Sequence, residues 1–490
     1  MGTMTPRCPP KEPLVVILGS TGTGKSDLAV ELATRFRGEV VNADAMQLYQ
    51  GLPAITNKMT TAERRGIPHH LLDHIPLDEP AWVVGDFKRA ANKVIREIRS
   101  RGNLPIVVGG THYYTNALLF EDMFVGPGHE GQGEAAPAAD VVPASDAGRF
   151  PILDEPTEVI LAKLRDVDPV MADKWHPNDR RKISRSLQIY LSHGRPASEI
   201  YAEQKRRTIA AAAAATETAP RGPWENLLFW VYSEPEVLKP RLDKRVDKML
   251  DVGLMDEVLQ MQNHVRAREA SGQEVDYTKG IWQSIGFKEF QPYLAAAAAA
   301  AAATPADPDV EKRRAQGLED MKASTRRYAK SQVRWITTKV VPRLQEQPGA
   351  MDSLFVLDST DVAQWAANVA EPAAAIARQF LGGEPTPEPV GLSPLARKVL
   401  ETETAGRTPC QKTCQLCQVT CTTEQDWKKH MRSKRHHAIA RRTKRRALVV
   451  VEPEARPEAR PEKEAEVAIA AESRDSSPEI GLSAFGLPAP

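Results

Sequence analysis

The stretch from Gly19 to Ser26 combines glycines, hydroxyls and a lysine at a spacing suited to holding phosphates. It reads GSTGTGKS and fits the pattern G-x-x-x-x-G-K-[ST], in which glycines let backbone N–H groups turn toward an anion. The lysine would reach the terminal phosphates, and the last hydroxyl could bind Mg²⁺. We therefore predict a diphosphate site, with Ser26 as a Mg²⁺ ligand, formed by Gly19, Ser20, Thr21, Gly22, Thr23, Gly24, Lys25 and Ser26.

The residues beside this loop predict the elements that position it. Residues 14–18 are a short, apolar, branched run typical of a buried parallel strand. After the loop, Leu28, Leu32 and Phe36 recur at helical spacing, so a helix should begin near Lys25 with its N-terminus at the anion site. The loop by itself recognises a diphosphate, and it leaves open whether the ligand is ATP or another diphosphate.

A carboxylate follows the second predicted strand, residues 39–42. Asp44 comes just after this strand, at the edge where open α/β sheets bind ligands. There it could bind Mg²⁺, act as a general base, or cap the following helix. Gln47 stands three residues later, so a helical turn would place its amide on the same side, where it suits the hydrogen-bonding edge of an adenine.

A third strand, predicted over residues 104–108, leads into Gly109, Gly110 and Thr111. The two glycines permit close approach of the backbone to a ligand, and Thr111 is either a helix N-cap or a phosphate-binding hydroxyl. Three consecutive strands thus bring the loop lysine, Asp44 and Thr111 to one rim. With helical segments between them, they predict an α/β fold whose core is a P-loop NTPase-like, doubly wound parallel sheet.

Basic residues recur on predicted helices. In WHPNDRRKISRSLQIYLSHG, Asn178 or Asp179 would start a helix on which Arg181 and Arg185 share one face. The apolar face of this helix would be formed by Ile183, Leu187, Tyr190 and Leu191. Similar basic residues follow at Arg241, Arg245, Arg326, Arg327, Lys330 and Arg334. A single basic pair is usually only solvated, but repeated basic faces favour a partner with phosphodiester groups.

Cysteines and histidines toward the C-terminus have the spacing of a zinc ligand set. Two residues separate Cys414 from Cys417, twelve more precede His430, and five separate His430 from His436. This C-x2-C-x12-H-x5-H pattern predicts one structural Zn²⁺ in tetrahedral coordination by two sulfurs and two nitrogens. Cys421 would then be a core residue of the finger.

The charge is unevenly distributed along the chain, although the formal net charge is only +1. Residues 427–446 contain many basic and no acidic residues, whereas residues 451–479 are rich in Glu and Pro. The sequence contains no apolar run long enough to predict a transmembrane span, and its first residues lack the apolar core of a secretory signal. We expect a cytoplasmic monomer without membrane association, with the mitochondrion and the nucleus as alternative or additional compartments.

Seven motifs occur together in one order. They are GSTGTGKS, NADAMQLY, ITNKMTTAERRGIPHHLLD, PIVVGGTHYY, HPNDRRKISRSL, GIWQSIGFKEF and TRRYAKSQVRWI. With these motifs the chain resembles the eukaryotic tRNA dimethylallyltransferases, also called tRNA isopentenyltransferases. The resemblance covers about residues 14–343 with gaps at the inserts, and it resumes at the finger, which is similar to the matrin type.

The resemblance implies that the loop holds dimethylallyl diphosphate and that the acceptor is N6 of the adenine at tRNA position 37. It implies Asp44 as the catalytic base, Thr111 and Arg245 as catalytic residues that bind the diphosphate, and Gln47 as a reader of the adenine. Family members commonly have Ser where this chain has Ala45. The implied tRNA-binding residues are Asp44, Ala45, Met46, Gln47, Arg181, Lys182, Arg185, Gln283, Lys288, Arg326, Arg327 and Lys330.

The 490 residues are enough for two or three domains. Residues 126–147 have the composition of a flexible insert, and the alanine runs 210–215 and 295–303 are low-complexity expansions. We predict a catalytic core over residues 12–122 and 225–381, a helical insertion domain contacting tRNA over 123–224, a linker over 382–407, a zinc finger with a basic extension over 408–446, and a disordered acidic tail over 447–490.

Two other classes of protein compete with this interpretation. A P-loop kinase fused to an RNA-binding finger would explain the loop, Asp44 as a Mg²⁺ ligand and the basic tail, but not Gln47 or residues 280–289. A non-catalytic RNA-binding scaffold would need neither Asp44 nor an intact loop. We therefore predict a tRNA-modifying prenyltransferase, with Mg²⁺ and structural Zn²⁺ as cofactors and with dimethylallyl diphosphate and the tRNA anticodon arm as partners.

Overall fold

The structure is a computed structural model that describes residues 9–120, 150–214, 224–301, 309–403 and 409–447. The predicted insert at 126–147 and the acidic tail from residue 448 onward lie outside these residues. The chain divides into two compact units, residues 1–172 with 180–406, and residues 173–179 with 407–490. Among the described helices, none has both the length and the apolar composition to cross a membrane.

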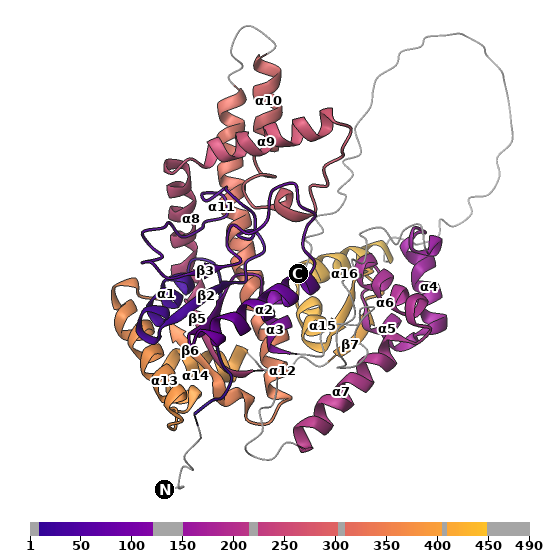
Figure 1. Ribbon diagram of the computed structural model, residues 1–490. Coiled ribbons are helices and arrows are strands. Elements are labelled where there is room, and N and C mark those ends of the chain that lie inside the picture. The colour runs from indigo at the N-terminus through magenta and orange to yellow at the C-terminus, as the bar shows by residue number, and fades with distance from the viewer. Residues whose placement is uncertain (1–8, 121–149, 215–223, 302–308, 404–408, 448–490) are drawn as a thin grey trace, which may run out of the picture. The chain divides into compact units, whose positions relative to one another are not determined.

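A six-stranded sheet forms the centre of the larger unit (Figure 1). The strand order is β3-β2-β4-β1-β5-β6, and every neighbouring pair is parallel. The strands are β1 (Pro13–Gly19), β2 (Gly38–Asn42), β3 (His69–His70), β4 (Leu104–Val108), β5 (Glu225–Tyr232) and β6 (Leu354–Asp358). The predicted parallel sheet is confirmed. Strands β3 and β5 were not predicted, although β5 reads ENLLFWVY and carries the apolar run of a buried strand.

The side chains of β1 alternate between the two faces of the sheet, as the period of a strand requires. Leu14, Val16 and Leu18 join one hydrophobic cluster, while Val15 and Ile17 join the other. Helices therefore cover both faces, because each apolar face must be removed from water. The helices that contribute to these clusters include α1 (Lys25–Phe36), α2 (Val84–Ser100), α3 (His112–Leu119) and α13 (Glu371–Gly382).

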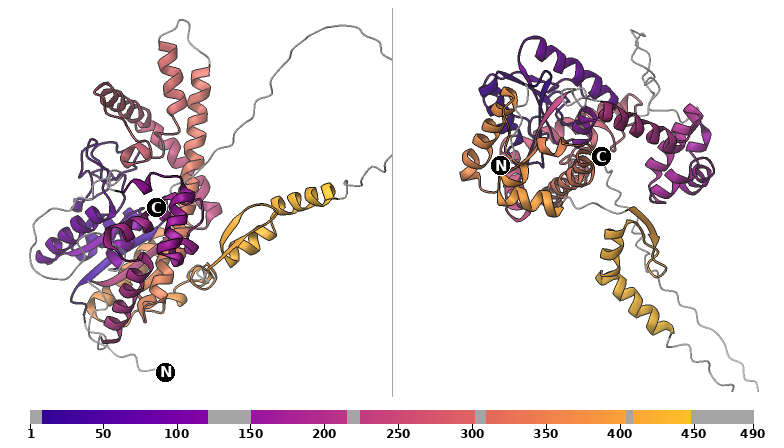
Figure 2. Two further views of the ribbon diagram at one scale, coloured as in Figure 1. Left: turned by 90° about the vertical axis from the view of Figure 1, so that its right-hand side faces the viewer. Right: turned by 90° about the horizontal axis from the view of Figure 1, so that it is seen from below.

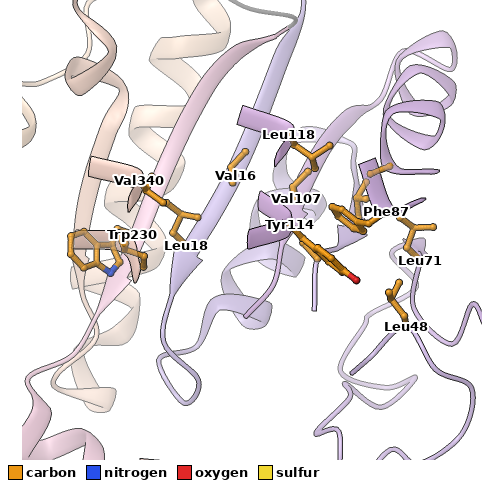
Figure 3. Close-up of a cluster of buried hydrophobic side chains, with 14 of the residues drawn as sticks. Val16, Leu18, Leu48, Leu71, Phe87, Val107, Tyr114, Leu118, Trp230 and Val340 are labelled. Atoms are coloured by element: carbon orange, nitrogen blue, oxygen red, sulfur yellow. The ribbon is translucent and has the colours of Figure 1, made fainter. Parts of the chain in front are cut away.

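The first cluster fixes α3 against the sheet. Phe87 of α2 and Tyr114 of α3 stack with ring centroids 4.2 Å apart and planes inclined by 7°. Figure 3 shows both rings beside Leu71 and Leu48, with Val16 of β1 on the other side. Since α3 begins directly after the turn that follows β4, this packing also holds that turn at the sheet edge.

Helices predicted between residues 155 and 204 are present. They are α4 (Thr157–Val167), α5 (Pro169–Lys174), α6 (Arg180–His193) and α7 (Ala197–Ala214), preceded by the short turn η3 (Pro151–Leu153). Ile183 and Leu187 of α6 are buried, as predicted, and so is Ile189. Tyr190 and Leu191 are half-buried.

Two long helices after β5 carry residues of the candidate site. These are α8 (Pro235–Asp251) and α11 (Asp309–Trp335). Ion pairs join them, with Lys322 Nζ 2.8 Å from Asp247 and with the guanidinium of Arg326 on Asp243. Between them come α9 (Leu254–Ala270), the turn η4 (Gly280–Gln283) and α10 (Gln291–Ala301), and Figures 1 and 2 show α10 side by side with α11.

The segment after α11 completes the larger unit. A π-helical segment η5 (Ile336–Val340) leads into α12 (Val341–Gln345), and the turn η6 (Ala350–Ser353) precedes β6. The predicted last strand at 354–357 is confirmed. The helix predicted at 362–380 is divided into η7 (Val362–Gln364), η8 (Ala366–Ala370) and α13.

The predicted linker over residues 382–407 is wrong for most of its length. The turn η9 (Pro389–Gly391), helix α14 (Pro394–Lys398) and segment η10 (Val399–Glu403) occupy it. Leu395, Ala396, Val399 and Leu400 are buried in the first hydrophobic cluster. These four residues lie at helical spacing and form an apolar stripe, which outweighs the Pro- and Gly-rich composition just before it.

The smaller unit contains the predicted finger. A two-stranded antiparallel ribbon, β7 (Pro409–Thr413) and β8 (Thr420–Thr423), precedes α15 (Glu424–Met431) and α16 (Lys434–Ala447). The hydroxyl of Thr423 caps α15 by accepting a hydrogen bond from the N–H of Asp426.

Candidate active site

The phosphate loop lies between β1 and α1, which begins at Lys25 as predicted. Gly24 has φ 85°, a left-handed conformation that turns the chain into the helix. A Cβ on Gly19, where φ is 144°, would lie 2.4 Å from the carbonyl oxygen of Val231. The glycines at 19, 22 and 24 all have positive φ, and Gly19 in addition packs closely against β5.

Lys25 lies over its own loop. Its Nζ donates a hydrogen bond of 2.7 Å to the carbonyl oxygen of Ser20, which also accepts one of 2.9 Å from the hydroxyl of Thr23. Burial lowers the pKa of Lys25 to about 8, and the nearby guanidinium of Arg245 acts in the same direction, while Asp44 opposes both. A charged lysine held by one carbonyl can move to a stronger acceptor, such as a diphosphate oxygen.

Asp44 follows β2 at the predicted sheet edge, in irregular backbone just before a turn over residues 45–48, and no helix follows it there. Its Oδ1 accepts a hydrogen bond of 3.0 Å from the N–H of Met46. Its own N–H donates to Oδ1 of Asn42, whose amide donates to the carbonyl oxygen of Leu71. Burial raises the pKa of the Asp44 carboxyl, although the backbone N–H groups of Met46, Gly110 and Gln47 and the charge of Lys25 act against that shift. A carboxylate with a raised pKa is a better proton acceptor.

The turn Gly109-Gly110 passes close to Asp44. A Cβ on Gly110 would lie 2.7 Å from Oδ2 of Asp44, so no side chain fits there. Thr111 occupies the N-cap position of α3, but its hydroxyl makes no capping bond and instead accepts a hydrogen bond of 3.0 Å from the N–H of Ala45. The structure therefore places the Thr111 hydroxyl beside the Asp44 segment, and capping of α3 is not its role.

Two arginines of α8 face the phosphate loop. Arg241 donates to carbonyl oxygens of Gly22, Ser359 and Thr360, at 3.4, 3.1 and 2.8 Å. The inclusion of Arg241 in a basic face for phosphodiester binding is therefore wrong, because its guanidinium is used to hold backbone. Arg245 is half-buried, and its Nε has no hydrogen-bond partner among the described residues.

The electrostatic setting of Arg245 favours an anion. Burial lowers its pKa to about 10, and the negative charge of Asp44 opposes that shift. A guanidinium removed from water and without a full set of acceptors gains when an anion enters. Lys25, Arg245 and Asp44 influence one another electrostatically, so the structure brings these three predicted residues together.

Gln47 differs in detail from the prediction. It lies in a turn, and its Nε2 donates to the carbonyl oxygens of Thr56 and Asn57 at 3.1 and 3.0 Å. A bidentate amide–adenine pair needs an N–H of the amide as well as its oxygen. Since the backbone uses both N–H groups here, the carbonyl oxygen of Gln47 is the atom left to meet a base.

The predicted tRNA-binding residues of the later helices and of η4 differ in their exposure to solvent. Arg326 is half-buried and pairs with Asp243, so its charge is already matched within the protein. Gln283, at the end of η4, is half-buried. The exposed members are Arg181, Lys182, Arg185, Lys288, Arg327 and Lys330.

The basic pair of α6 lies near the candidate site. Burial raises the pKa of Tyr113, the residue two positions after Thr111, and the charges of Arg181 and Arg185 act in the opposite direction. The ring of Tyr113 meets that of Trp335 edge to face, with centroids 6.0 Å apart. Helix α6 thus adds positive charge next to the turn that carries Thr111.

The four predicted zinc ligands converge in the finger. One ligand atom from each of Cys414, Cys417, His430 and His436 lies within 4.8 Å of the others. Nδ1 of His436 is 3.6 and 3.4 Å from the sulfurs of Cys414 and Cys417, a spacing that one tetrahedral ion can bridge. The buried Nε2 of His430 has no hydrogen-bond partner in the described part of the chain. Cys421 is buried, as predicted.

Gln332 and Tyr328 are site residues that the sequence interpretation missed. Gln332 is buried on α11 and bonds to both the phosphate loop and Gly110, while Tyr328 donates to the carbonyl oxygen of Gly110 at 3.2 Å. The sequence feature that could have indicated them is their spacing. They are polar residues four positions apart, which lie on one side of an amphipathic helix.

Comparisons with known proteins show which families this chain is similar to. The IPP transferase family matches residues 47–339, and the C2H2-type zinc-finger family matches residues 412–436. The tRNA dimethylallyltransferase of Schizosaccharomyces pombe is 38% identical, over 89% of this chain and 96% of that protein. The tRNA dimethylallyltransferase of Homo sapiens is 34% identical, over 86% of this chain and 85% of that protein.

A solved structure extends the similarity to the fold. A eukaryotic dimethylallyltransferase, studied crystallographically while acting on tRNA, superposes with a TM-score of 0.70. It is 32% identical, and the match covers 89% of this chain and 98% of that one.

Proposed function

The chain belongs to the tRNA dimethylallyltransferase family, and we propose that it transfers a dimethylallyl group from dimethylallyl diphosphate to N6 of the adenine at tRNA position 37. The products are N6-isopentenyladenosine and diphosphate. The observation that carries this proposal is the convergence of a phosphate loop, Arg245 and a carboxylate of raised pKa at one edge of the sheet. That set suits a reaction that releases an anion and a proton together.

Leaving-group stabilisation is the first task in this reaction. As N6 forms a bond with the allylic carbon, the bond from that carbon to diphosphate breaks and its electron pair goes to a diphosphate oxygen. Lys25, Arg245 and the N–H groups of residues 19–26 would stabilise this growing charge, and the Thr111 hydroxyl would contribute from the adjacent turn. No D-D-x-x-D motif occurs in the sequence, so the phosphate loop takes the place of such a diphosphate clamp.

Mg²⁺ would be held at Ser26 in this proposal. Ser26 stands in the first turn of α1 beside Lys25 and is half-buried, and a hydroxyl oxygen is a ligand that Mg²⁺ accepts together with phosphate oxygens. When bound, the ion would neutralise part of the diphosphate charge.

Proton removal is the task of Asp44. The N6 amine of adenine is a weak nucleophile, and its proton must leave as the new N–C bond forms. The adenine has to leave the anticodon stack to reach this buried carboxylate. The carbonyl oxygen of Gln47 would accept a hydrogen bond from a base amine, since the amide N–H groups donate to backbone.

The proposal is tested by incubating full-length protein with radiolabelled dimethylallyl diphosphate and tRNA in the absence of ATP. We expect label in tRNA, and in isopentenyladenosine after digestion to nucleosides. A tRNA with guanine at position 37 is the control. Transfer that requires ATP, or phosphorylation of a small molecule, would instead support the kinase interpretation.

The exposed basic residues of α6 are proposed to contact phosphates of the tRNA anticodon arm, as are Lys288, Arg327 and Lys330. We expect Arg181→Ala with Arg185→Ala to weaken tRNA binding and to reduce the slope of log affinity against log salt by about 1–2 units, because two phosphate contacts are lost. The measurement is tRNA binding by filter retention from low to moderate salt. An unchanged slope would show that this face does not meet tRNA.

The finger is proposed to hold one structural Zn²⁺ and to grip RNA through its basic helices. All four ligand positions come from protein, so no position is open for water or substrate. We expect removal of residues 408–446 to weaken tRNA affinity, most visibly at raised salt, while single-turnover transfer at saturating tRNA stays similar. Loss of the chemical step in this truncation, with circular dichroism showing a folded core, would place the finger in the active site.

The proposed enzyme acts as a monomer on cytoplasmic tRNA. The basic run at 441–446 has the composition of a nuclear import signal, so the nucleus is an alternative compartment, as is the mitochondrion. Light scattering during size exclusion and fractionation of cells test these two statements directly.

A further inference from the structure

We propose that Gln332 is a positioning residue that sets the conformation of the phosphate loop and couples it to α11, so that tRNA and diphosphate promote each other's binding. This inference rests on the proposed function, because it takes the exposed basic face of α11 as a tRNA contact.

The side chain of Gln332 bridges two loops that follow different strands. Its Oε1 accepts a hydrogen bond of 2.8 Å from the N–H of Thr21 in the phosphate loop after β1. Its Nε2 donates one of 2.9 Å to the carbonyl oxygen of Gly110, in the turn after β4. Gln332 is only 3% exposed, so neither loop group can exchange this partner for water at low cost.

The bond to Thr21 determines where Lys25 rests. The N–H of Thr21 and the carbonyl of Ser20 belong to one planar peptide unit, so a change in the direction of one changes the direction of the other. The Ser20 carbonyl oxygen is the group that accepts hydrogen bonds from Lys25 Nζ and from the Thr23 hydroxyl. A shift of Gln332 would therefore turn this peptide and move the lysine that meets the diphosphate.

Helix α11 connects this contact to the surface. Arg327 and Lys330 are exposed on α11, whereas Tyr328 and Gln332 on its inner side both donate to the carbonyl oxygen of Gly110. Phosphates that bind the exposed side would bias the position of the whole helix, because a helix moves as a unit. The loop groups held by the inner side would then follow.

Helix α8 also contacts the phosphate loop. Arg241 of α8 donates to the carbonyl oxygen of Gly22, one residue beyond Thr21. The ion pairs Arg326–Asp243 and Lys322–Asp247 join α8 to α11. Helices α11 and α8, which are joined by ion pairs, thus bond to Thr21 and Gly22 of the phosphate loop. A movement of this pair of helices would therefore move the loop.

The test is a binding cycle on full-length protein, with inorganic pyrophosphate as the probe. Calorimetry measures pyrophosphate affinity without tRNA and with saturating tRNA, in wild type, Gln332→Met and Gln316→Met. Methionine has a volume and helix propensity close to those of glutamine but makes neither hydrogen bond. Gln316 is the matched control, because it is an exposed glutamine on the same helix and its amide donates to Asp320 of that helix.

For wild type and Gln316→Met we expect saturating tRNA to tighten pyrophosphate binding by the same factor. For Gln332→Met we expect pyrophosphate affinity to fall on the order of tenfold. We also expect saturating tRNA to leave the pyrophosphate affinity of this variant almost unchanged, so that the ratio of the two affinities approaches one. By reciprocity, pyrophosphate must change tRNA affinity by the same factor, which provides an independent check. Unfolding midpoints establish that the variant is folded.

Two results would overturn the inference. One is a wild type in which tRNA leaves pyrophosphate affinity unchanged. The other is a folded Gln332→Met variant that keeps the wild-type coupling factor, since a merely structural contact would alter stability without altering coupling. Transfer of radiolabelled prenyl groups by the wild type reports separately on the proposed function, so failure of the two proposals can be distinguished.

Discussion

Asp44→Asn is expected to reduce dimethylallyl transfer by about 10²–10⁴-fold while leaving tRNA affinity close to that of wild type. An amide keeps the size of the side chain and can still accept the hydrogen bond from the Met46 N–H. It cannot take a proton from N6. The loss should therefore appear in single-turnover transfer at saturating tRNA and saturating dimethylallyl diphosphate, and not in tRNA binding by filter retention.

The pH dependence of the wild type provides a second measurement of this role. Burial raises the pKa of the Asp44 carboxyl above its ordinary value of 3.8. The base is then protonated and inactive below this raised pKa, so transfer should fall as the pH is lowered through it. The acidic limb of the profile should be absent from the residual activity of Asp44→Asn.

Asp358→Asn is a matched control for this variant. Asp358 also ends a strand of the sheet, β6, and its Oδ1 accepts a hydrogen bond from the N–H of Thr360. The same substitution there should leave transfer near the wild-type rate. If Asp44→Asn transfers prenyl groups as fast as Asp358→Asn, then Asp44 has a structural role and the proposed proton transfer is wrong.

Lys25→Ala is expected to lower kcat/KM for dimethylallyl diphosphate by about 10²–10³-fold, through both a raised KM and a lowered kcat. The reason is that negative charge on the diphosphate grows as the carbon–oxygen bond breaks, so the lysine stabilises the transition state more than the bound donor. Arg245→Ala should behave similarly, since its guanidinium is also half-buried and close to Asp44.

The lowered pKa of Lys25 predicts how donor binding changes with pH. In the free protein this pKa is about 8, so the lysine loses its charge as the pH rises through that value. KM for the donor should therefore rise above about pH 8 in the wild type, and this rise should be absent from Lys25→Ala.

Lys239→Ala is a control for the removal of a lysine. Lys239 is exposed on α8 and pairs with Glu236, three residues away on the same helix. Its removal should leave donor kinetics unchanged. A Lys25→Ala variant that changed only tRNA affinity, with donor KM and kcat unaltered, would contradict the assignment of the loop to diphosphate.

The sequence by itself located the residues that carry the proposed chemistry of this protein. The phosphate loop, the strand ends that carry Asp44 and Thr111, and the zinc ligands are all defined by short spacings, because glycine conformations, helix starts and metal coordination depend on residues close together in the chain. For the same reason the parallel sheet could be predicted, since buried strands alternating with helices leave few other arrangements.

Tertiary structure alone decided which groups meet across long separations in the chain. In the sequence, Arg241 and Arg326 cannot be distinguished from exposed basic residues. In the structure, however, Arg241 donates to the carbonyl oxygen of Gly22, and Arg326 forms an ion pair with Asp243. The helix at 394–398 was hidden by its Pro-rich surroundings, and its burial depends on an apolar surface supplied by distant elements. The contact between Gln332 and the phosphate loop spans 311 residues, and only the packing of α11 against the sheet edge brings those two groups within hydrogen-bonding distance.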